Sequence, residues 1–156
     1  MDIKDFIEKK KKITIKVRAK DEELMPYYAS EGAAGADVRA AIDHDIVIAK
    51  GTSALIPTGL TFELPAGFEI QVRPRSGLAL KFGITVLNAP GTIDSDYRGE
   101  VGVILMNHGH VDFTVTPKMR IAQIVVAPVT VAQFVNAECL AASNRGSGGF
   151  GHTGSD

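Results

Sequence analysis

Cysteine is nearly absent from the sequence. Its 156 residues include a single cysteine, Cys139, which excludes an internal disulfide. We expect this thiol to be buried or half-buried and inert, and not a catalytic nucleophile. A single domain of about 150 residues buries roughly two-thirds of its unfolded surface and needs no crosslink. The lack of disulfides suits a reducing compartment, and we predict a cytoplasmic protein.

Long apolar runs and an excess of either charge are also lacking. The N-terminal stretch 1–12 is charged and has no apolar core of the kind that a secretory signal requires. The most apolar stretch, 121–135, is interrupted by two glutamines, a proline and a threonine, and is too polar to cross a bilayer. The net charge of −1 shows no bias toward nucleic acid. We therefore expect neither a membrane nor a nucleic-acid partner, and any polyanion site must be built locally from a few arginines.

Sustained helical periodicity is missing too, and only 76–82 is a candidate for a short helix. Short runs rich in Val, Ile, Thr and Phe alternate with Gly, Pro and Asn turns every 8–12 residues or so, which is typical of strands. The predicted strands are 13–17, 45–49, 61–64, 68–72, 84–87, 101–106, 111–115, 123–129 and 131–135. This pattern predicts an all-β sandwich or barrel. We divide the chain into a flexible charged leader (1–12), a β-barrel domain (13–140) and a mobile C-terminal tail (141–156).

The tail contains a glycine-rich stretch, RGSGGFGHTG, at 145–154. Its Gly146, Gly148 and Gly151 form a G-x-G-x-x-G pattern, which cradles phosphates in dinucleotide-binding folds. That motif needs a strand before it and a helix after it, and neither is predicted here. A Rossmann fold is therefore excluded, and the stretch is a mobile glycine loop that needs another explanation.

Two stretches of the predicted barrel carry residues suited to phosphate chemistry. In PRSGLA (74–79), Arg75 offers a planar charged fork, and the next two residues open a short helix whose free N–H groups attract anions. The alternative is an ordinary capped helix start. In GTIDSDYRGEV (91–101), Asp94 follows the apolar Ile93, and we expect it to be partly buried and able to take a proton from water. The alternative is a solvated hairpin, in which Asp96 is a turn or structural residue.

Two further stretches are ambiguous when taken alone. AAGADVRA (33–40) places Asp37 after a turn of small residues, where an Asx turn is the alternative to a functional carboxylate. KMRIAQIVV (118–126) places Arg120 and Gln123 at the start of an apolar run, as the edge of a strand also would. No H-x-x-x-H, C-x-x-C or dense carboxylate cluster appears, so a metal cage made by the protein alone is not expected. The histidines at 44, 108 and 110 are expected at the surface.

In this order, the stretches AGAD (34–37), PRSGLA (74–79), NAPGTIDSDYRGE (88–100), RIAQ (120–123) and RGSGGFGHTG (145–154) resemble the five motifs of the trimeric dUTPases. The resemblance runs from about residue 13 to the end. It implies a jelly-roll-like β-barrel, a homotrimer with shared active sites, and hydrolysis of dUTP to dUMP and pyrophosphate. That reaction keeps uracil out of DNA and supplies dUMP for thymidylate synthesis.

The resemblance also implies roles for individual residues. Asp94 matches the catalytic aspartate that activates the water attacking the α-phosphorus, with Mg²⁺ on the triphosphate. Asp37 matches the residue that holds metal-bound water, and Arg120 supports the site. The implied substrate-binding residues are Arg75, Ser76, Gly77 and Gln123 at the phosphates, Asn88, Gly91, Thr92 and Ile93 at the uracil, and Tyr97 beneath the deoxyribose. In the tail, Arg145, Gly149, Phe150, Gly151, His152 and Thr153 would close over the nucleotide, with Arg145 on the γ-phosphate and Phe150 stacked on uracil.

One motif departs from the family pattern. The fourth motif commonly carries a Gly-Asp or Gly-Met pair before its arginine, and here the pair is Lys118-Met119. Two rival functions share this fold. The first is a dCTP deaminase, which attacks the base, and the second is a non-catalytic nucleotide-binding regulator. The Asp-Ser-Asp-Tyr stretch and the Gly-Gly-Phe-Gly tail favour the dUTPase prediction over the deaminase.

Overall fold

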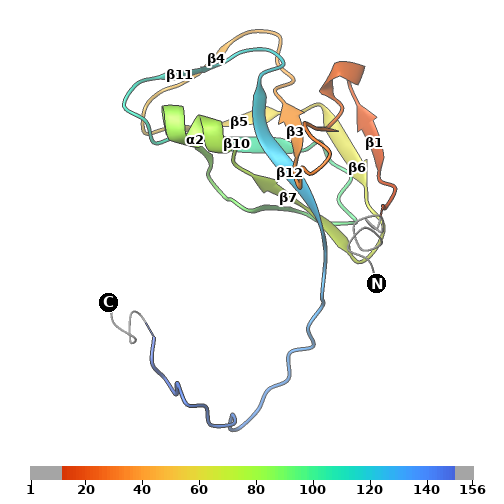
Figure 1. The fold of residues 1–156 in the computed structure, drawn as a ribbon, viewed down its shortest axis with the longest axis vertical. Helices are drawn as coiled ribbons and strands as arrows, with labels where there is room; N and C mark the ends of the chain where they lie inside the picture. The colour runs from red at the N-terminus through yellow and green to blue at the C-terminus, as the bar shows by residue number, and fades with distance from the viewer. Residues whose placement is uncertain (1–11, 150–156) are drawn as a thin grey trace.

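The computed structural model describes residues 12–149, which form a barrel of short antiparallel strands with one α-helix (Figure 1). The elements are β1 (Lys16–Ala19), the 3-10 helix η1 (Glu22–Leu24), β2 (Tyr27–Tyr28), β3 (Ala36–Arg39), β4 (Ile46–Ile48), β5 (Ser53–Pro57), β6 (Leu60–Glu63), β7 (Phe68–Arg73), α2 (Ser76–Phe82), β8 (Ile84–Val86), β9 (Gly91–Ile93), β10 (Gly102–Asn107), β11 (Phe113–Val115) and β12 (Arg120–Pro128). The prediction of an all-β fold is confirmed.

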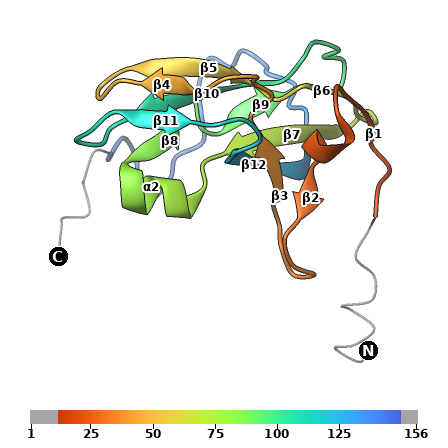
Figure 2. The ribbon, with the colours of Figure 1, turned by 90° about the horizontal axis from the view of Figure 1, so that it is seen from above.

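The strands form four antiparallel sheets that wrap around one core (Figure 2). The largest sheet has the order β2-β3-β12-β7-β9, and a three-stranded sheet has the order β5-β10-β8. The pairs β1-β6 and β4-β11 complete the barrel. Most pairings join strands that are distant in the sequence, so the barrel depends on contacts across the whole chain and not on a series of local hairpins.

Alternation of apolar and polar residues explains most of these strands. In β10, Val103, Leu105 and Asn107 are buried and the residues between them are more exposed, as expected when successive side chains point to opposite faces. The buried Asn107 is fully paired. Its amide nitrogen donates to the carbonyl oxygens of Ile48 and Val111, both at 2.9 Å, and its Oδ1 accepts from the Gly109 N–H at 2.8 Å. A buried polar group with all its partners in place stabilises the loop it joins.

The predicted helix over 76–82 is confirmed as α2 (Ser76–Phe82). Leu78 is buried against the core, which anchors the helix to the barrel. The helix ends at Gly83, whose φ of 69° lies in the left-handed region that glycine adopts readily. Figure 2 shows α2 at the edge of the barrel next to β8 and β11.

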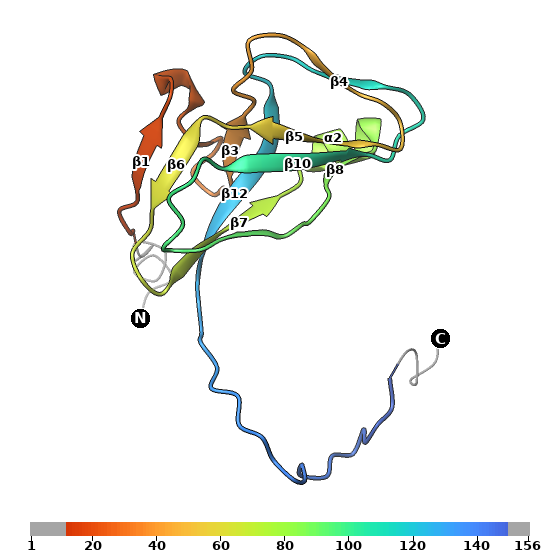
Figure 3. The same ribbon diagram turned by 180° about the vertical axis from the view of Figure 1, so that it is seen from behind.

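Two predictions about the C-terminal part were wrong. Residues 131–135 form no strand, because no helix or strand follows Pro128 within the described residues. The side chains there are solvent-exposed, with Val131 at 88% and Phe134 at 95%. Cys139, expected to be buried or half-buried, is also exposed. After β12 the backbone leaves the barrel (Figures 1 and 3), so no packing partner within the chain fixes these residues.

The turn before β12 keeps its shape although the motif lacks the usual glycine. Lys118 has a φ of 61°, in the left-handed region that costs a non-glycine residue roughly 1–2 kcal/mol. Its N–H donates to the Ala40 carbonyl at 2.9 Å, and its ammonium pairs with Glu23 and with Asp21, the latter at 3.5 Å. Glu23 is the larger influence and, with Asp21, raises the pKa of Lys118 above its ordinary value. These contacts stabilise a turn that glycine would adopt without strain.

The prediction that the histidines at 44, 108 and 110 lie at the surface is confirmed. His44, His108 and His110 are exposed. Over the described residues, no helix has the length and apolar character that crossing a membrane requires.

Candidate active site

Polar side chains from four strands lie in one row on the outer face of the five-stranded sheet. Tyr27 of β2 pairs with Asp37 of β3, Asp37 pairs with Gln123 of β12, and Gln123 pairs with Arg73 of β7. Residues directly opposite each other on neighbouring strands share a face. The flanking residues of β3 face the core, so this row faces outward. Residues separated by up to 96 positions in the sequence are thereby brought together.

A β-bulge in β12 places Arg120 and Gln123 on the same face. Residues three apart in a regular strand point to opposite faces. Here the register shifts between Arg120 and Ala122, so that Arg120 pairs with Arg39 and Gln123 pairs with Asp37. A bulge inserts one extra residue and re-aims the side chains beyond it. The Arg-Ile-Ala-Gln motif therefore projects both of its polar side chains outward from one side of the sheet.

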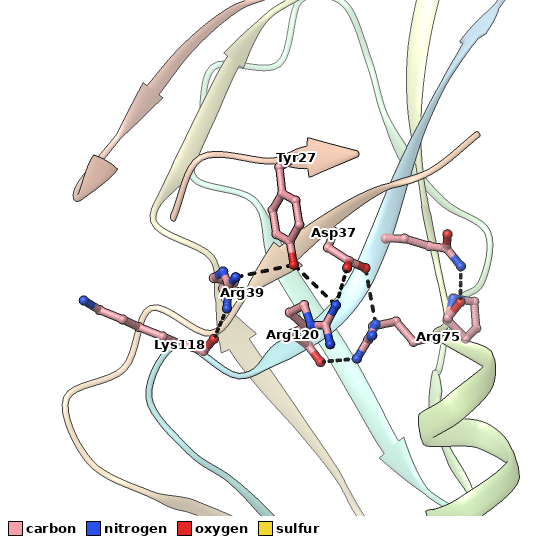
Figure 4. Close-up of polar contacts among 8 residues, drawn as sticks. Tyr27, Asp37, Arg39, Arg75, Lys118 and Arg120 are labelled. Atoms are coloured by element: carbon pink, nitrogen blue, oxygen red, sulfur yellow. Dashed lines mark hydrogen bonds and ion pairs between the residues drawn. The ribbon is translucent and has the colours of Figure 1, made fainter. Parts of the chain in front are cut away.

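Asp37 is the centre of this cluster and is only 9% exposed. Its Oδ1 is 3.3 Å from Nε of Arg75, and its Oδ2 is 3.1 Å from Nη1 of Arg120 (Figure 4). Arg75 also donates from Nη1 to the Arg120 carbonyl at 3.2 Å. The Asp37 carboxylate thus accepts a hydrogen bond from Arg120 and forms an ion pair with Arg75, and it fixes the spacing of the two arginines.

Tyr27 and Arg39 extend the cluster on its other side. The Tyr27 hydroxyl accepts from Nη1 of Arg120 at 3.3 Å and from Nη2 of Arg39 at 3.4 Å, and the Arg39 guanidinium lies over the Tyr27 ring at 5.3 Å (Figure 4). The bond to Tyr27, followed by that to Asp37, raises the pKa of Arg120 above its ordinary value. Two guanidinium groups therefore pair with the one carboxylate and a third joins the cluster through Tyr27, and the excess positive charge makes the cluster suited to an anion.

Gln123 is held over the small-residue turn before β3. Its Nε2 donates to the Pro74 carbonyl at 3.0 Å. A Cβ on Gly35 would lie 2.3 Å from the Gln123 Oε1, so only glycine leaves room for this side chain. The glycine of the Ala-Gly-Ala-Asp stretch therefore serves packing at the cluster, and Asp37 is held by ion pairs and not by the Asx turn that was the alternative from the sequence.

Arg75, Ser76 and Gly77 lie where β7 gives way to α2. Arg75 precedes the helix without a side-chain cap bond, and Ser76 and Gly77 are exposed in the first turn. Arg75 and Arg120 also line a groove of about 520 Å³ between α2 and β11, with Leu78 of α2 among its walls. The predicted phosphate residues of the second and fourth motifs are thus brought together with Asp37.

The third motif (88–100) forms a separate group. We call it the hairpin: it consists of β9, which pairs with β7, and the turns on either side of β9. Asn88 is exposed in the turn before β9, and the Ala89–Pro90 peptide bond is cis. Gly91, Thr92 and Ile93 form β9 at the edge of the five-stranded sheet, with Gly91 buried against Val72 of β7. A Cβ on Gly91 would lie 3.2 Å from the Val72 Cβ, so the close packing of the hairpin depends on this glycine.

Asp94 is exposed in the described chain, which corrects the expectation of partial burial. Ile93 packs against the core, and successive side chains of an extended segment point in opposite directions. Asp94 therefore projects into solvent. It lines a groove of about 680 Å³ together with Thr92, Tyr97 and the apolar side chains Leu55 and Ile104.

The predicted site residues do not all meet within one chain. The groove of Asp94 and Tyr97 shares no lining residue with the groove of Arg75 and Arg120. No hydrogen bond or ion pair within 12–149 joins these two groups or links either of them to Arg145. Arg145 instead donates to the Gly148 carbonyl at 2.7 Å in an exposed turn of the tail, close to Gly149. The predicted contacts of Phe150, Gly151, His152 and Thr153 lie outside the described residues.

Sequence reasoning missed Tyr27 and Arg39. Arg39 lies within the 33–40 stretch, where only Asp37 was singled out, and only the pairing of β2 with β3 brings Tyr27 to Asp37. The structure has no group of three or more His, Cys, Asp or Glu side chains placed to hold a metal ion, as far as residues 12–149 are concerned.

The ion pair of Glu100, at the end of the third motif, makes a contribution to stability that depends on pH. The pKa of Glu100 is lowered below its ordinary value of 4.5. The main cause is the Lys20 ammonium at 2.8 Å, and the Gly59 N–H, which donates to Glu100 at 2.9 Å, also lowers it. Its stabilising effect is therefore complete above pH 4.5 and is lost as the pH falls through the lowered pKa. We expect Glu100→Gln to lower the free energy of unfolding by up to about 1 kcal/mol at pH 6. Thermal unfolding at pH 6 to 3 should show this difference shrinking toward acid, and a constant difference would contradict the ion pair as its source.

The comparisons with known proteins place this chain in one family. A family model described as dUTPase matches residues 21–154. The deoxyuridine 5'-triphosphate nucleotidohydrolase of Chlamydia pneumoniae is 63% identical over 131 residues, covering 83% of this chain and 90% of the relative. That of Roseobacter denitrificans is 57% identical over 133 residues, covering 85% and 88%. Among solved structures, the Staphylococcus bacteriophage 80alpha dUTPase with dUPNHPP has a TM-score of 0.81 at 23% identity, covering 90% of this chain and 98% of that one. The chain belongs to the dUTPase family.

Proposed function

We propose that the chain hydrolyses dUTP to dUMP and pyrophosphate, which keeps uracil out of DNA and supplies dUMP for thymidylate synthesis. The observation that carries the proposal is the outward-facing cluster in which Arg75 and Arg120 pair with Asp37, while Arg39 joins the cluster through the Tyr27 hydroxyl. An excess of planar cationic side chains on a rigid sheet suits a triphosphate. Family membership supplies the substrate class, because relatives of high identity carry the name of this activity.

The phosphate chain would lie on Arg75, Ser76, Gly77 and Gln123. Arg75 is already fixed by Asp37 and by the Arg120 carbonyl, so its free guanidinium edge is presented without further ordering. Preorganised donors stabilise charge that develops on phosphate oxygens without a cost at the moment of reaction. Arg120 makes its bonds to Tyr27 and Asp37 and acts chiefly as a support for this arrangement.

The nucleoside would lie on the third-motif hairpin. Asn88 and the backbone of Gly91, Thr92 and Ile93 would recognise uracil, and the ring of Tyr97 would exclude a 2′-hydroxyl. Tyr97 is 44% exposed in the groove that Asp94 also lines. A base, a sugar and a water molecule can therefore be positioned by one rigid hairpin, with Asp94 accepting the proton of the water that attacks the α-phosphorus.

The chain's residues fit Mg²⁺ only as a partner of the substrate. Mg²⁺ prefers oxygen ligands and commonly binds phosphates while keeping several waters. Asp37 is the carboxylate beside the phosphate cluster, and both of its oxygens are already paired with arginines, so it would hold a metal-bound water and not the ion itself. The ion would neutralise charge on the triphosphate as pyrophosphate leaves. A solved dUTPase of Staphylococcus aureus phage phi11 is described with a structural Mg(II) ion, at a TM-score of 0.71 and 20% identity.

A homotrimer with shared active sites is part of the same proposal. The grooves of the hairpin and of the arginine cluster are separate within one chain, so a site that uses both is best completed by a second copy. The segment between β12 and the tail supports this, because its large apolar side chains are each at least 77% exposed: Val131, Phe134, Val135 and Leu140. Large exposed apolar side chains mark surfaces that another chain covers. The tail residues Arg145, Gly149, Phe150, Gly151, His152 and Thr153 would then close over the nucleotide.

A free, exposed thiol at Cys139 suits the cytoplasm.

The reaction is tested by incubating the protein with dUTP, UTP, dTTP and dCTP, with Mg²⁺ and then with EDTA. We expect pyrophosphate from dUTP alone and its loss with EDTA. Release of pyrophosphate from several nucleotides would support the hydrolysis but contradict the proposed selectivity for base and sugar. A deaminated product from dCTP would establish the deaminase alternative, and dUTP binding without any release would establish the non-catalytic regulator.

A further inference from the structure

Tyr97 is held in place by the residues that follow it. Its hydroxyl donates to the Glu100 carbonyl oxygen at 3.1 Å, which folds the ring back over the intervening backbone. Gly99 lies beneath the ring, and a Cβ there would be 2.3 Å from the Tyr97 Oη and 2.5 Å from its Cζ. Arg98 closes the same turn from outside, because its Nη1 donates to the carbonyls of Ser95 at 2.7 Å and Tyr97 at 3.0 Å. Any side chain at position 99 would therefore force the ring to move.

The acceptor of the Tyr97 hydroxyl is itself fixed to the rest of the barrel. Glu100 accepts the Gly59 N–H on Oε1 at 2.9 Å and pairs with Lys20 through Oε2 at 2.8 Å. Gly59 lies between β5 and β6, and Lys20 follows β1. The backbone carbonyl that holds the ring thus belongs to a residue anchored to two other parts of the fold, and the ring's orientation is set by the barrel and not by the hairpin alone.

We propose that Gly99 and Glu100 are specificity-determining positioning residues, which set the rejection of ribonucleotides by fixing the orientation of the Tyr97 ring. The proposal rests on the role proposed above for Tyr97. A ring excludes a 2′-hydroxyl by contact, so its effect depends on its height and tilt at that position. Rejection of one added hydroxyl by an apolar surface reaches only about 10²-fold, and a displaced ring loses most of that factor.

The direct test is Gly99→Ala, compared with Gly32→Ala as a matched control. A Cβ on Gly32 would meet no atom within 4 Å, and Gly32 lies in an exposed loop. The measurement is the ratio of kcat/KM for dUTP to kcat/KM for UTP. Gly99→Ala should lower this ratio by about tenfold or more, and Gly32→Ala should leave it unchanged. A loss of activity that is equal for both nucleotides would show a merely structural effect and overturn the proposal.

A double-mutant cycle separates this proposal from the one on which it rests. If Gly99 acts through Tyr97, then Gly99→Ala should not change the ratio further in a Tyr97→Ala background. A further drop in that background would place the effect elsewhere and reject the proposal. If Tyr97→Ala alone keeps the wild-type ratio, the sugar-sensing role of Tyr97 is wrong and both proposals fail. If Tyr97→Ala lowers the ratio and Gly99→Ala does not, only the positioning proposal fails.

Two further measurements apply should Gly99→Ala fold poorly. Tyr97→Phe removes the bond to the Glu100 carbonyl without adding an atom, and it should lower the ratio about two- to fivefold, as expected for one net hydrogen bond of about 0.5–1 kcal/mol. The chain has three tyrosines, so fluorotyrosine labelling gives few fluorine NMR signals, and Tyr97→Phe identifies that of Tyr97. This signal should shift in Glu100→Ala and not in Glu23→Ala, which removes an exposed ion pair with Lys118 in the turn before β12. An unchanged Tyr97 signal and ratio would overturn the proposal.

Discussion

Asp94→Asn is expected to lower kcat by about 10²–10⁴-fold, the usual contribution of a general base. The KM for dUTP should change little, because asparagine keeps the size and polarity of the side chain and loses only the ability to take a proton. The fold should not suffer, since the Asp94 carboxylate has no ion pair or hydrogen bond within 12–149. Its backbone carbonyl, which accepts the Tyr97 N–H at 3.2 Å, is untouched by the change. Steady-state kinetics with dUTP and Mg²⁺ give both constants.

Asp96→Asn is the matched control for this change. Asp96 is also exposed, lies two residues away in the same turn and carries the same charge. If Asp94 acts as the base, only Asp94→Asn should lose turnover. Equal losses in both variants would mean that the turn needs negative charge for another reason, such as placing a cation. Near-normal turnover in Asp94→Asn would show that the proton goes to another group.

The sequence predicts the barrel well where one face of a strand is buried. Burial alternates along β10, and β12 is a longer apolar run with its bulge near the start; the predicted boundaries of both strands lie within a few residues of the observed ones. The two- and three-residue strands β2 and β9 give no such signal, because they are too short to show a period. The run 131–135 carries strand-forming residues without a strand beside it. Local propensity cannot show whether a pairing partner exists.

The structure brings some of the predicted site residues together, and the sequence alone does not give the geometry that does so. Asp37 lies beside Gln123 through the pairing of β3 with β12 and beside Arg75 through an ion pair, and Arg120 joins them on the same face through the bulge at Arg120/Ala122, which no local pattern reveals. Tyr27 joins them only through strand pairing. The expected burial of Asp94 failed because an apolar neighbour in the sequence, Ile93, points to the opposite side of the chain. Contacts that depend on register or on a second chain lie beyond what one sequence specifies.

Deletion of residues 145–156 is expected to lower kcat/KM for dUTP by about 10–100-fold while the barrel stays folded. Arg145 is the cation proposed to reach the γ-phosphate, and one hydrogen bond to a charged group contributes about 1.5–3 kcal/mol, which corresponds to that range. The barrel does not depend on this segment, because the hydrogen bonds of residues 130–149 are confined to the turn at 143–148. The free energy of unfolding should therefore change by less than about 0.5 kcal/mol.

The matched control is a deletion of Ser155 and Asp156 alone, which leaves the glycine-rich stretch complete and should keep full activity. Comparing the two truncations by thermal unfolding and by kinetics separates the effect of the tail on activity from its effect on stability. A glycine-rich segment costs about 1–2 kcal/mol per residue to order, so it should close only when binding of the nucleotide offsets that cost. Added salt should then lower the kcat/KM of the intact enzyme more than that of the protein lacking 145–156, since this deletion removes an ionic interaction between Arg145 and the phosphates. A truncated protein that unfolds, or one that keeps wild-type kcat/KM, would reject the tail as a closing segment and leave the reaction to the hairpin and the arginine cluster.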